Sequence, residues 1–471
     1  MIDLKDLRER PEHYREGVEN KNGDPASVDA LLEADANLRA LLTEQQALTA
    51  EKNAIGKEIG QLAGRLKKAS PDDRSALQSE MSALQARPNA IKARQDELAP
   101  ELKAAEVARD DLLLEMPQPA DADVPVGKSA DDNVELRRWS PPTFDPTKTF
   151  TDNKGFEAKS HLELCASLGL VDFERGVKVA GSRSYVLTGQ GMRLHQALLR
   201  FAFDFMTVDN GFTPLSASCL VRHHTLVGTG FFPHGREQVY DVANPTAEGG
   251  LALTGTGEVG LMAYHMDEIL SADELPKCYT TVSTCFRREA GSAGKDTAGL
   301  YRIHQFDKVE QVVICEADEQ VSRDWHGKMI GYVETLLQKL ELPYRLLHCC
   351  TGDLGPKNAD MIDLECWMPS RASTPACPDG TKDTSGGWGE THSASRLYDY
   401  QTRRLNLRYR DPADPKGKRT VFCHSLNNTV AASPRLMIPV LEIHQDRDGG
   451  VTIPPPLRPY MQGQARIEPV A

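Results

Sequence analysis

The sequence lacks the features of a membrane protein, a secreted protein and a metal-binding cysteine framework. No apolar run approaches the roughly 18 residues that a membrane span requires. The first 17 residues carry charges of both signs and contain no apolar secretion core. Its ten cysteines include no CxxC pair, so we interpret them as reduced core thiols. These absences predict a cytoplasmic protein.

A basic surface is also missing. The chain has 55 Lys and Arg against 68 Asp and Glu, which gives a formal net charge of −13. Broad, sequence-independent binding of nucleic acid needs a basic face, so any RNA contact is expected to be a local patch. Of the 471 residues, 40% are hydrophobic and 26% are charged. This composition is typical of a soluble globular protein with roughly two to four domains.

A long helical repeat runs over residues 28–66. Positions 31, 34, 38, 41, 45, 48, 52, 55, 59, 62 and 66 alternate in steps of three and four, and all but Gln45 and Lys52 are Leu, Ile or Ala. This spacing predicts a coiled-coil seam on a helix of about 58 Å. Heptad spacing resumes over 77–112, where Pro88 and Pro100 are expected to bend the helix. We therefore expect residues 1–115 to form an antiparallel helical arm.

Residues 116–135 are rich in Pro and Asp and are interpreted as a linker. The domain that follows, 136–471, mixes short β-branched strands with helices such as 191–206 and 319–340, without a regular βαβ alternation. This pattern favours an α+β fold over a doubly wound one. A polar loop over 371–389 is expected at the surface.

The stretch FRREAGSAGKDTAGLYRIHQFDKVE, residues 286–310, is the most informative in the chain. The β-rich runs YTTVSTCFR and FDKVEQVVI flank its polar loop and predict an antiparallel hairpin. Arg287 offers a planar fork to a phosphate, Glu289 can accept from an exocyclic amine, and a purine can stack on Phe306. This layout suits ATP without a P-loop, although an ordinary salt-bridged surface hairpin has the same local signature.

This hairpin resembles motif 2 of the class II aminoacyl-tRNA synthetases, and in particular that of the seryl-tRNA synthetases. Strings at 125–139, 171–183, 228–230, 351–355 and 457–461 are also similar to that family's, in its order. The resemblance implies a class II antiparallel sheet flanked by helices, with a coiled-coil arm at the N-terminus. It also implies an enzyme that activates serine with ATP and transfers it to tRNA(Ser).

The resemblance assigns the ATP site residue by residue. Arg287 matches the arginine that touches the α-phosphate and the serine carboxylate, and Arg435 matches the motif 3 arginine near the γ-phosphate. By the same match, Glu289 reads the adenine amine, Phe306 stacks on the ring and Arg302 helps to bind phosphate. Both arginines are expected to act as catalytic residues, since charge crowds at phosphorus in this reaction.

The serine site is implied in the same way. Thr256 and Glu258 match the family's TxE loop for the substrate ammonium, and Arg287 again serves the carboxylate. Glu310 and Thr429 match the positions that hydrogen-bond the serine hydroxyl. A buried carboxylate that awaits a hydroxyl penalises alanine by a factor that can approach ~10⁴. Zinc is not expected, because the family's zinc-dependent branch would show metal ligands in place of the TxE loop.

Glu390 and Ser393 match the family's metal-binding pair, and oxygen ligands suit Mg²⁺. The sequence departs from the family here, because Gly389 replaces an arginine and His392 replaces a serine. Motif 3 departs too, since it lacks the Gly-rich lead-in. Its residues Ser433 and Pro434 predict a helix that starts at Pro434 with Ser433 as the N-cap, and Pro439 predicts a kink in that helix.

The arm leaves two interpretations open. Periodicity alone fits a dimerisation coiled coil as well as a binding arm. A basic cluster near the tip favours RNA, because it supplies phosphate contacts on an acidic protein; it comprises Arg65, Lys67, Lys68 and Arg74. The family resemblance implies a homodimer whose arms reach across to the long variable arm of tRNA(Ser).

Two alternative functions fit parts of the sequence. One is a serine-activating paralogue in antibiotic biosynthesis or resistance, and the other is a catalytically silent RNA-binding relative. The intact arm argues against a ligase that serves a carrier protein. The joint presence of the ATP and serine residues argues against a silent protein. The departures around Thr429, Val430, Pro434 and His392 raise the hypothesis of a specialised second copy, with lineage drift as the other explanation.

Overall fold

A computed structural model describes residues 1–243, 249–291, 298–371 and 386–470. The chain divides into two compact units. One comprises residues 3–15 and 24–116, and the other comprises residues 1–2, 16–23 and 117–471. Among the described residues, no helix is both long enough and apolar enough to cross a membrane. Most of the loop expected at 371–389 lies outside the described residues.

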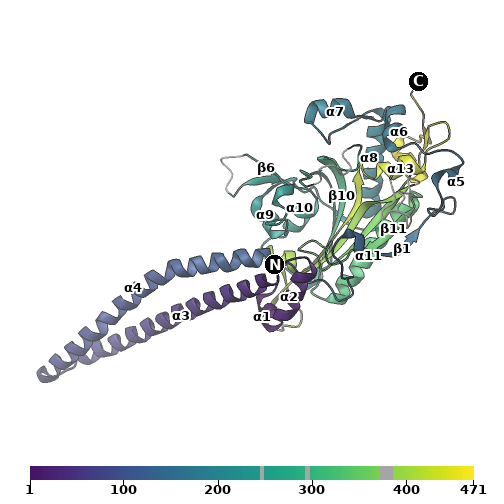
Figure 1. Cartoon of the computed structure of the whole chain (residues 1–471). Helices are drawn as coiled ribbons and strands as arrows, with labels where there is room; N and C mark the ends of the chain where they lie inside the picture. Colours follow the sequence, from purple (N-terminus) through teal and green to yellow (C-terminus); the bar gives the residue numbers. More distant parts are fainter. Residues whose placement is uncertain (244–248, 292–297, 372–385, 471) are drawn as a thin grey trace. The chain divides into compact units, whose positions relative to one another are not determined.

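The first unit is a pair of long helices. After α1 (Leu4–Glu9) and the start of α2 (Pro11–Asn20) come α3 (Ala26–Leu66) and α4 (Pro71–Glu115), which lie side by side (Figure 1). Leu38 of α3 packs against Leu98, Leu102 and Ala105 of α4, as the heptad spacing predicts. The chain continues as one helix through Pro88 and Pro100, and α4 is visibly curved (Figure 1).

The second unit is built on a sheet that has eight strands within the described residues, in the order β1-β11-β12-β13-β16-β10-β9-β4. All neighbours are antiparallel except β4 and β9. This arrangement confirms the expected α+β class II fold. The strands are β1 (Val134–Trp139), β4 (Thr213–Pro214), β9 (Lys277–Phe286), β10 (Gln305–Cys315), β11 (Tyr344–His348), β12 (Asp360–Met368), β13 (Gly387–Tyr398) and β16 (His424–Ser433).

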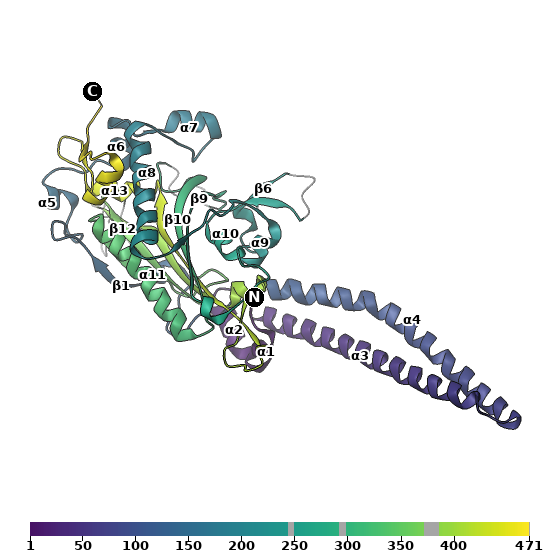
Figure 2. The same ribbon diagram turned by 180° about the vertical axis from the view of Figure 1, so that it is seen from behind.

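One face of this sheet carries the main hydrophobic core. Helices α8 (Gly189–Asp204), α11 (Glu319–Lys339) and α13 (Met437–Ile443) cover that face, together with α6 (His161–Ser167) (Figure 2). On the other face, α10 (Glu258–Ala263) packs against β9 and β10 through a smaller cluster that includes Met262, Val312 and Ile314. The helices expected at 191–206 and 319–340 are therefore present with closely similar bounds.

The remaining elements form small sheets and short helices around this core. The helices are α5 (Phe150–Lys154), α7 (Phe173–Ala180), α9 (His223–Gly228) and α12 (Tyr400–Arg404). The strand pairs and triplets are β2 (Val171–Asp172) with β3 (Val186–Leu187); β5 (Leu220–Arg222), β7 (Leu251–Leu253) and β6 (Tyr240–Val242); β8 (Ile269–Leu270), β14 (Arg408–Arg410) and β15 (Thr420–Phe422); and β17 (Val451–Thr452) with β18 (Arg466–Ile467).

The expected hairpin is confirmed as β9 and β10, with Phe306 opposite Cys285 and Glu310 opposite Thr281. Side chains alternate between the two faces of a strand. In β10, Val309 and Val313 therefore point into the main core, whereas Phe306 and Lys308 line a cavity on the other face. This alternation places Phe306 and Lys308 on the same face of the hairpin, away from the main core.

The prediction of a helix that starts at Pro434 is wrong. Ser433 is the last residue of β16, and α13 begins at Met437. The Ser433 hydroxyl does not cap a helix, because it lies 2.8 Å from Nδ1 of His195 in α8. Nε2 of the same imidazole lies 3.0 Å from the Asp307 carboxylate of β10. His195 thus ties α8 to both strands that carry the cavity.

The kink predicted at Pro439 has no basis either. In the observed α13, Pro439 is the third residue, and the first turn of a helix has no internal partners for its N–H groups. The proline ring therefore removes no helical hydrogen bond. The error follows from the misplaced helix start.

Candidate active site

A cavity lies over the ends of β9, β10, β13 and β16. Six of the residues predicted to bind ATP, serine or metal line it directly: Arg287, Glu289, Phe306, Glu390, Thr429 and Arg435. Residues that are 148 positions apart in the chain, such as Arg287 and Arg435, therefore share one pocket. A neighbouring cavity continues along Phe231, Gly255 and Arg302.

Arg287 and Phe306 form the centre of the cavity. The guanidinium carbon of Arg287 lies 5.2 Å from the centroid of the Phe306 ring, which is cation–π distance. Nε of Arg287 also donates to the carbonyl of Gly255 at 3.3 Å. The arginine is exposed and lines the cavity, and these two contacts hold its guanidinium group.

Glu289 and Arg302 form an ion pair across the motif 2 loop. Nη1 of Arg302 donates to Oε2 of Glu289 at 3.2 Å. Glu289 has a left-handed backbone with φ +53°, an uncommon conformation for a residue other than glycine. Such a conformation is often found where the surrounding structure fixes a side chain for function.

Arg435 also lines the cavity and is held by two carbonyl groups. Its Nε donates to Tyr301 O at 3.1 Å and its Nη1 to Glu390 O at 3.1 Å. Its guanidinium carbon also lies 4.4 Å from the centroid of the Tyr301 ring. The two predicted catalytic arginines therefore approach the same space from motif 2 and motif 3.

The residues predicted to read serine form a buried cluster beside this space. Glu310 has no exposed surface and pairs with the ammonium of Lys308. Its other oxygen accepts from Asn427 Nδ2 at 3.1 Å. Thr256 Oγ1 lies 2.7 Å from Lys308 Nζ and 3.4 Å from Glu310 Oε2. The sequence prediction omitted Lys308 and Asn427, although alternation along β10 puts Lys308 on the same face as Phe306.

Glu258 is the second buried carboxylate, with 2% of its surface exposed. It lies at the start of α10, next to Thr256, whose Oγ1 accepts from the Glu258 backbone N–H at 3.3 Å. Lys357 and Gln401 both donate to its Oε1, the latter at 2.6 Å. No sequence signal pointed to these two donors, which lie 99 and 143 positions away in the chain.

The two predicted metal ligands lie on β13. Glu390 is exposed and its Oε1 lies 3.6 Å from Arg435, whereas Ser393 lies directly opposite Asp363 of β12. Burial, followed by the negative charge of Glu390, raises the pKa of Asp363 well above its usual range. Oδ1 of Asp363 is buried without a hydrogen-bond partner in the described structure. Uncompensated carboxylate oxygens of this kind fit a divalent cation.

His392, one of the departures from the family string, is buried between β13 and β16. Its Nε2 lies 3.1 Å from Val430 O and its Nδ1 lies 2.8 Å from Thr391 Oγ1. Burial lowers its pKa to about 3, so the ring is neutral at physiological pH. Two of the departures, His392 and Val430, are thus in direct contact behind the cavity.

The predicted basic cluster lies at the tip of the arm. Lys67 and Arg74 border one surface groove together with Leu66 and Gln78. Arg65, Lys67, Lys68 and Arg74 stand at the end of α3 and in the first turn of α4. The position of these cations is therefore compatible with contacts to a polyanion.

Two family models match the chain. The Seryl-tRNA synthetase N-terminal domain matches residues 1–118, and the tRNA synthetase class II core domain (G, H, P, S and T) matches residues 240–444. The serine–tRNA ligase of Deinococcus radiodurans is 42% identical over 465 residues, which cover 98% of each chain.

Solved structures give the same result. The seryl-tRNA synthetase from Pyrococcus horikoshii, complexed with ATP, has a TM-score of 0.84 and 36% identity over 100% of both chains. The cytoplasmic serine-tRNA ligase from Naegleria fowleri, in complex with AMP, has a TM-score of 0.79 and 29% identity, and covers 98% of this chain and 96% of that one.

Proposed function

The chain belongs to the serine–tRNA ligases, a family of class II aminoacyl-tRNA synthetases, and we infer from this that it forms seryl-adenylate from serine and ATP and then transfers the serine to tRNA(Ser). The observation that carries this inference is one cavity in which the Arg287–Phe306 pair adjoins the buried Lys308–Glu310 pair. The first pair suits a nucleotide, and the second suits a small amino acid with a hydroxyl group.

In the proposed first step, the serine carboxylate attacks the α-phosphate and pyrophosphate leaves. Negative charge increases on the phosphate oxygens, so fixed cations stabilise the transition state. Arg287 can contact the carboxylate and the α-phosphate together, and Arg435 approaches from the other side. Both guanidinium groups are already held by carbonyl oxygens, so little ordering is needed when the substrates bind.

We propose that the base of ATP lies on Phe306, with Glu289 at its exocyclic amine and Arg302 at a phosphate. The Glu289–Arg302 ion pair supports this assignment, because it orients the carboxylate beside the cavity. Glu289 must exchange or share that contact when the nucleotide binds. Phe306 offers one face of its ring to Arg287, and the base is expected on the face toward the cavity.

We propose that the serine hydroxyl is read by Glu310 and Thr429 and that its ammonium is read by Thr256 and Glu258. Glu310 is fully buried, and Lys308 and Asn427 contact one of its oxygens each, so its carboxylate can still accept a further hydrogen bond. A substrate without a hydroxyl group leaves this polar pocket with an unmet hydrogen bond, which costs binding energy. Alanine is therefore expected to be a very poor substrate.

Mg²⁺ fits the oxygen atoms of Glu390 and Ser393, with Asp363 behind Ser393. When bound, a divalent cation supplies positive charge to the phosphate oxygens. In this proposal Glu390 and Ser393 would hold the ion, and Asp363 lies opposite Ser393 in the neighbouring strand. Glu390 Oε1 lies 3.6 Å from Arg435, so it also helps to place the motif 3 guanidinium.

We also propose that the enzyme is a homodimer that binds tRNA(Ser) through its arm. Val282 of β9 and Met192 of α8 each keep 43% of their surface exposed. Val282 lines a groove together with Phe203 of α8. Exposed apolar side chains in such a groove suit burial against a second copy. The basic arm tip supplies the phosphate contacts that an acidic protein needs.

That this protein is a specialised second copy of the enzyme remains a prediction. Nε2 of His392 contacts the main-chain carbonyl of Val430, which is next to Thr429 of the cavity. The test compares inhibition by a non-hydrolysable seryl-adenylate analogue between this enzyme and a bacterial relative with a Gly-rich motif 3. Equal inhibition constants would leave lineage drift as the explanation.

Charging of tRNA(Ser) with labelled serine tests the proposed function. The full chain should charge tRNA(Ser) only when serine and ATP are both present. Serine-dependent pyrophosphate exchange without charging would point to a biosynthetic relative that serves another acceptor. The absence of both activities would point to a catalytically silent RNA-binding protein.

A further inference from the structure

The protein contacts only one of the two carboxylate oxygens of Glu258. Lys357 Nζ and Gln401 Nε2 both contact its Oε1. Within the described residues, no hydrogen bond reaches Oε2. The proposed function places the ammonium of serine at this residue. One oxygen is therefore held by the protein, and the other is left for a substrate cation.

We propose that Lys357 is a positioning residue for serine recognition, which holds Oε1 of Glu258 so that Oε2 receives the substrate ammonium. The inference rests on the proposed function and adds a residue to it. Burying a carboxylate is costly unless a cation compensates its charge. Lys357 supplies that cation at Oε1 of Glu258.

The ammonium of Lys357 is itself fixed. It lies 4.1 Å from the centroid of the Phe231 ring, within cation–π distance. Phe231 also lines the cavity next to the ATP site. Gln401, the second donor to Glu258, contacts the carbonyl of Thr229 at 2.9 Å. The carboxylate is thus held by two donors that are each anchored to the same 229–231 segment.

Hydrogen bonds fix the backbone on both sides of Lys357. Lys21 Nζ donates to Gly355 O at 3.0 Å and to Asn358 O at 2.6 Å. From the predicted linker, Gln118 N donates to Pro356 O at 2.8 Å. Asp121 N likewise donates to Ala359 O at 2.9 Å. The segment 355–360 therefore has little freedom, which suits a residue whose role is to set a position.

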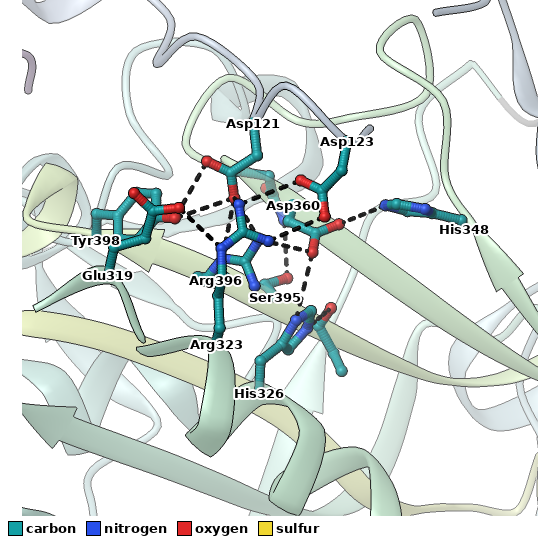
Figure 3. A network of polar contacts seen from close by, with 12 residues as sticks. Asp121, Asp123, Glu319, Arg323, His326, His348, Asp360, Ser395, Arg396 and Tyr398 are labelled. Carbon is teal, nitrogen blue, oxygen red and sulfur yellow. Dashed lines mark hydrogen bonds and ion pairs between the residues drawn. The ribbon is translucent and has the colours of Figure 1, made fainter. Parts of the chain in front are cut away.

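An ion network fixes the end of this segment (Figure 3). Arg396, only 3% exposed in its side chain, contacts the carboxylates of Asp360, at 3.0 Å, and of Asp121. His348 and His326 approach the Asp360 carboxylate at 2.9 and 3.5 Å. Burial opposes ionisation of Asp360, but the contacts from His326, His348 and Arg396 lower its pKa. The linker and the 355–360 segment are thus joined through buried charges.

The test uses Lys357→Met, which removes the cation but keeps a long side chain. In ATP–pyrophosphate exchange the KM for serine should rise at least tenfold, while the KM for ATP and kcat stay within about threefold of the unmodified enzyme. Lys357→Arg should recover part of the serine affinity, because it restores the charge. Lys416→Met, at an exposed lysine of the same unit, is the matched control.

An unchanged serine KM in a Lys357→Met protein with an unchanged melting temperature would overturn the inference. A lower serine KM would overturn it too, because Lys357 would then compete with the substrate. Should Lys357→Met fail to fold, Lys357→Gln provides the same readout with a donor in place. A parent enzyme without serine-dependent exchange would refute the proposed function itself, which keeps the two failures distinct.

The ion network around Asp360 allows a second, independent test. Asp121→Asn weakens the tie to Arg396 without touching the cavity, so the serine KM should rise in the same direction by about threefold. Combined with Lys357→Met, it should add little to the effect of that variant alone, since both act through Glu258. Strictly multiplicative effects would overturn the role of the linker in positioning Lys357.

Discussion

The guanidinium of Arg287 lies over the ring of Phe306, with its carbon 5.2 Å from the ring centroid. Because this contact and the Gly255 carbonyl hold the arginine in the cavity, its fork is ready for a phosphate before ATP arrives. The pair therefore combines the charge and the stacking surface that adenylate formation needs.

Replacing Arg287 by Ala should cost at least ~3 kcal/mol of transition-state stabilisation, in line with the loss of one preorganised donor. The measurement is kcat/KM for serine-dependent pyrophosphate exchange. Arg175→Ala, at an arginine of α7 whose side chain is 81% exposed, is the control. Exchange that survives Arg287→Ala at the control rate would refute the assignment of the motif 2 arginine.

Glu310→Gln should weaken serine activation by about 100-fold or more and lower the melting temperature. The substitution removes the charge that compensates Lys308, which is buried as well, and breaking a buried ion pair is strongly destabilising. Steady-state exchange kinetics and a thermal melt measure the two effects. The affinity for ATP should change little, because the base is expected to stack on Phe306. A variant that still prefers serine over alanine as strongly as its parent would exclude Glu310 from hydroxyl recognition.

Neutralising Arg65, Lys67, Lys68 and Arg74 together should weaken tRNA binding and flatten its salt dependence. Each lost phosphate contact reduces the slope of log K against log salt by about one, so the slope should fall by up to about four. Pyrophosphate exchange without tRNA should remain normal. Lys92→Ala with Lys103→Ala, both exposed on α4, serves as the control. An unaltered salt slope would show that the arm tip makes no phosphate contacts.

The stability of the protein should fall as the pH drops below about 6.5, in part because of His444. Burial lowers the pKa of His444 from 6.5 to about 4. Between these values the unfolded chain binds a proton that the folded His444 does not, so folded-state stability is lost as the pH falls through this window. Between pH 7 and 5 the loss is on the order of 2 kcal/mol.

Urea unfolding at pH 7 and pH 5 measures this loss. His444→Gln can keep the hydrogen bond to Leu340 O, which His444 Nε2 makes at 2.9 Å, and it should show a smaller loss than the parent protein. His224→Gln, at an exposed histidine, is the control. An equal loss in the parent and in His444→Gln would show that His444 does not contribute.

Sequence reasoning succeeded where the determining forces are local. The helix expected over 28–66 is α3, because a heptad seam needs only a partner that comes next in the chain. The β9–β10 hairpin followed from two β-rich runs around a polar loop. Alternation along β10 then accounts for Phe306 and Lys308 on one face, and the same rule could have added Lys308 to the predicted site.

Sequence reasoning failed where a distant residue decides. Ser433 before Pro434 is a good local signal for a helix start, but the Ser433 hydroxyl binds His195, which lies 238 positions away. The contact of Lys357 with Glu258 has no local signature at all, since an isolated lysine in a polar loop resembles any surface lysine. Only the fold brings Lys357 of the 355–360 segment to Glu258.

Serine-dependent exchange of pyrophosphate into ATP by the purified full-length protein tests the central claim most directly. The account predicts rapid exchange with serine, none without an amino acid, and a kcat/KM for alanine lower by a factor approaching ~10⁴, because Glu310 would be left without the substrate hydroxyl. Absence of exchange with serine, or equal exchange with serine and alanine, would contradict it.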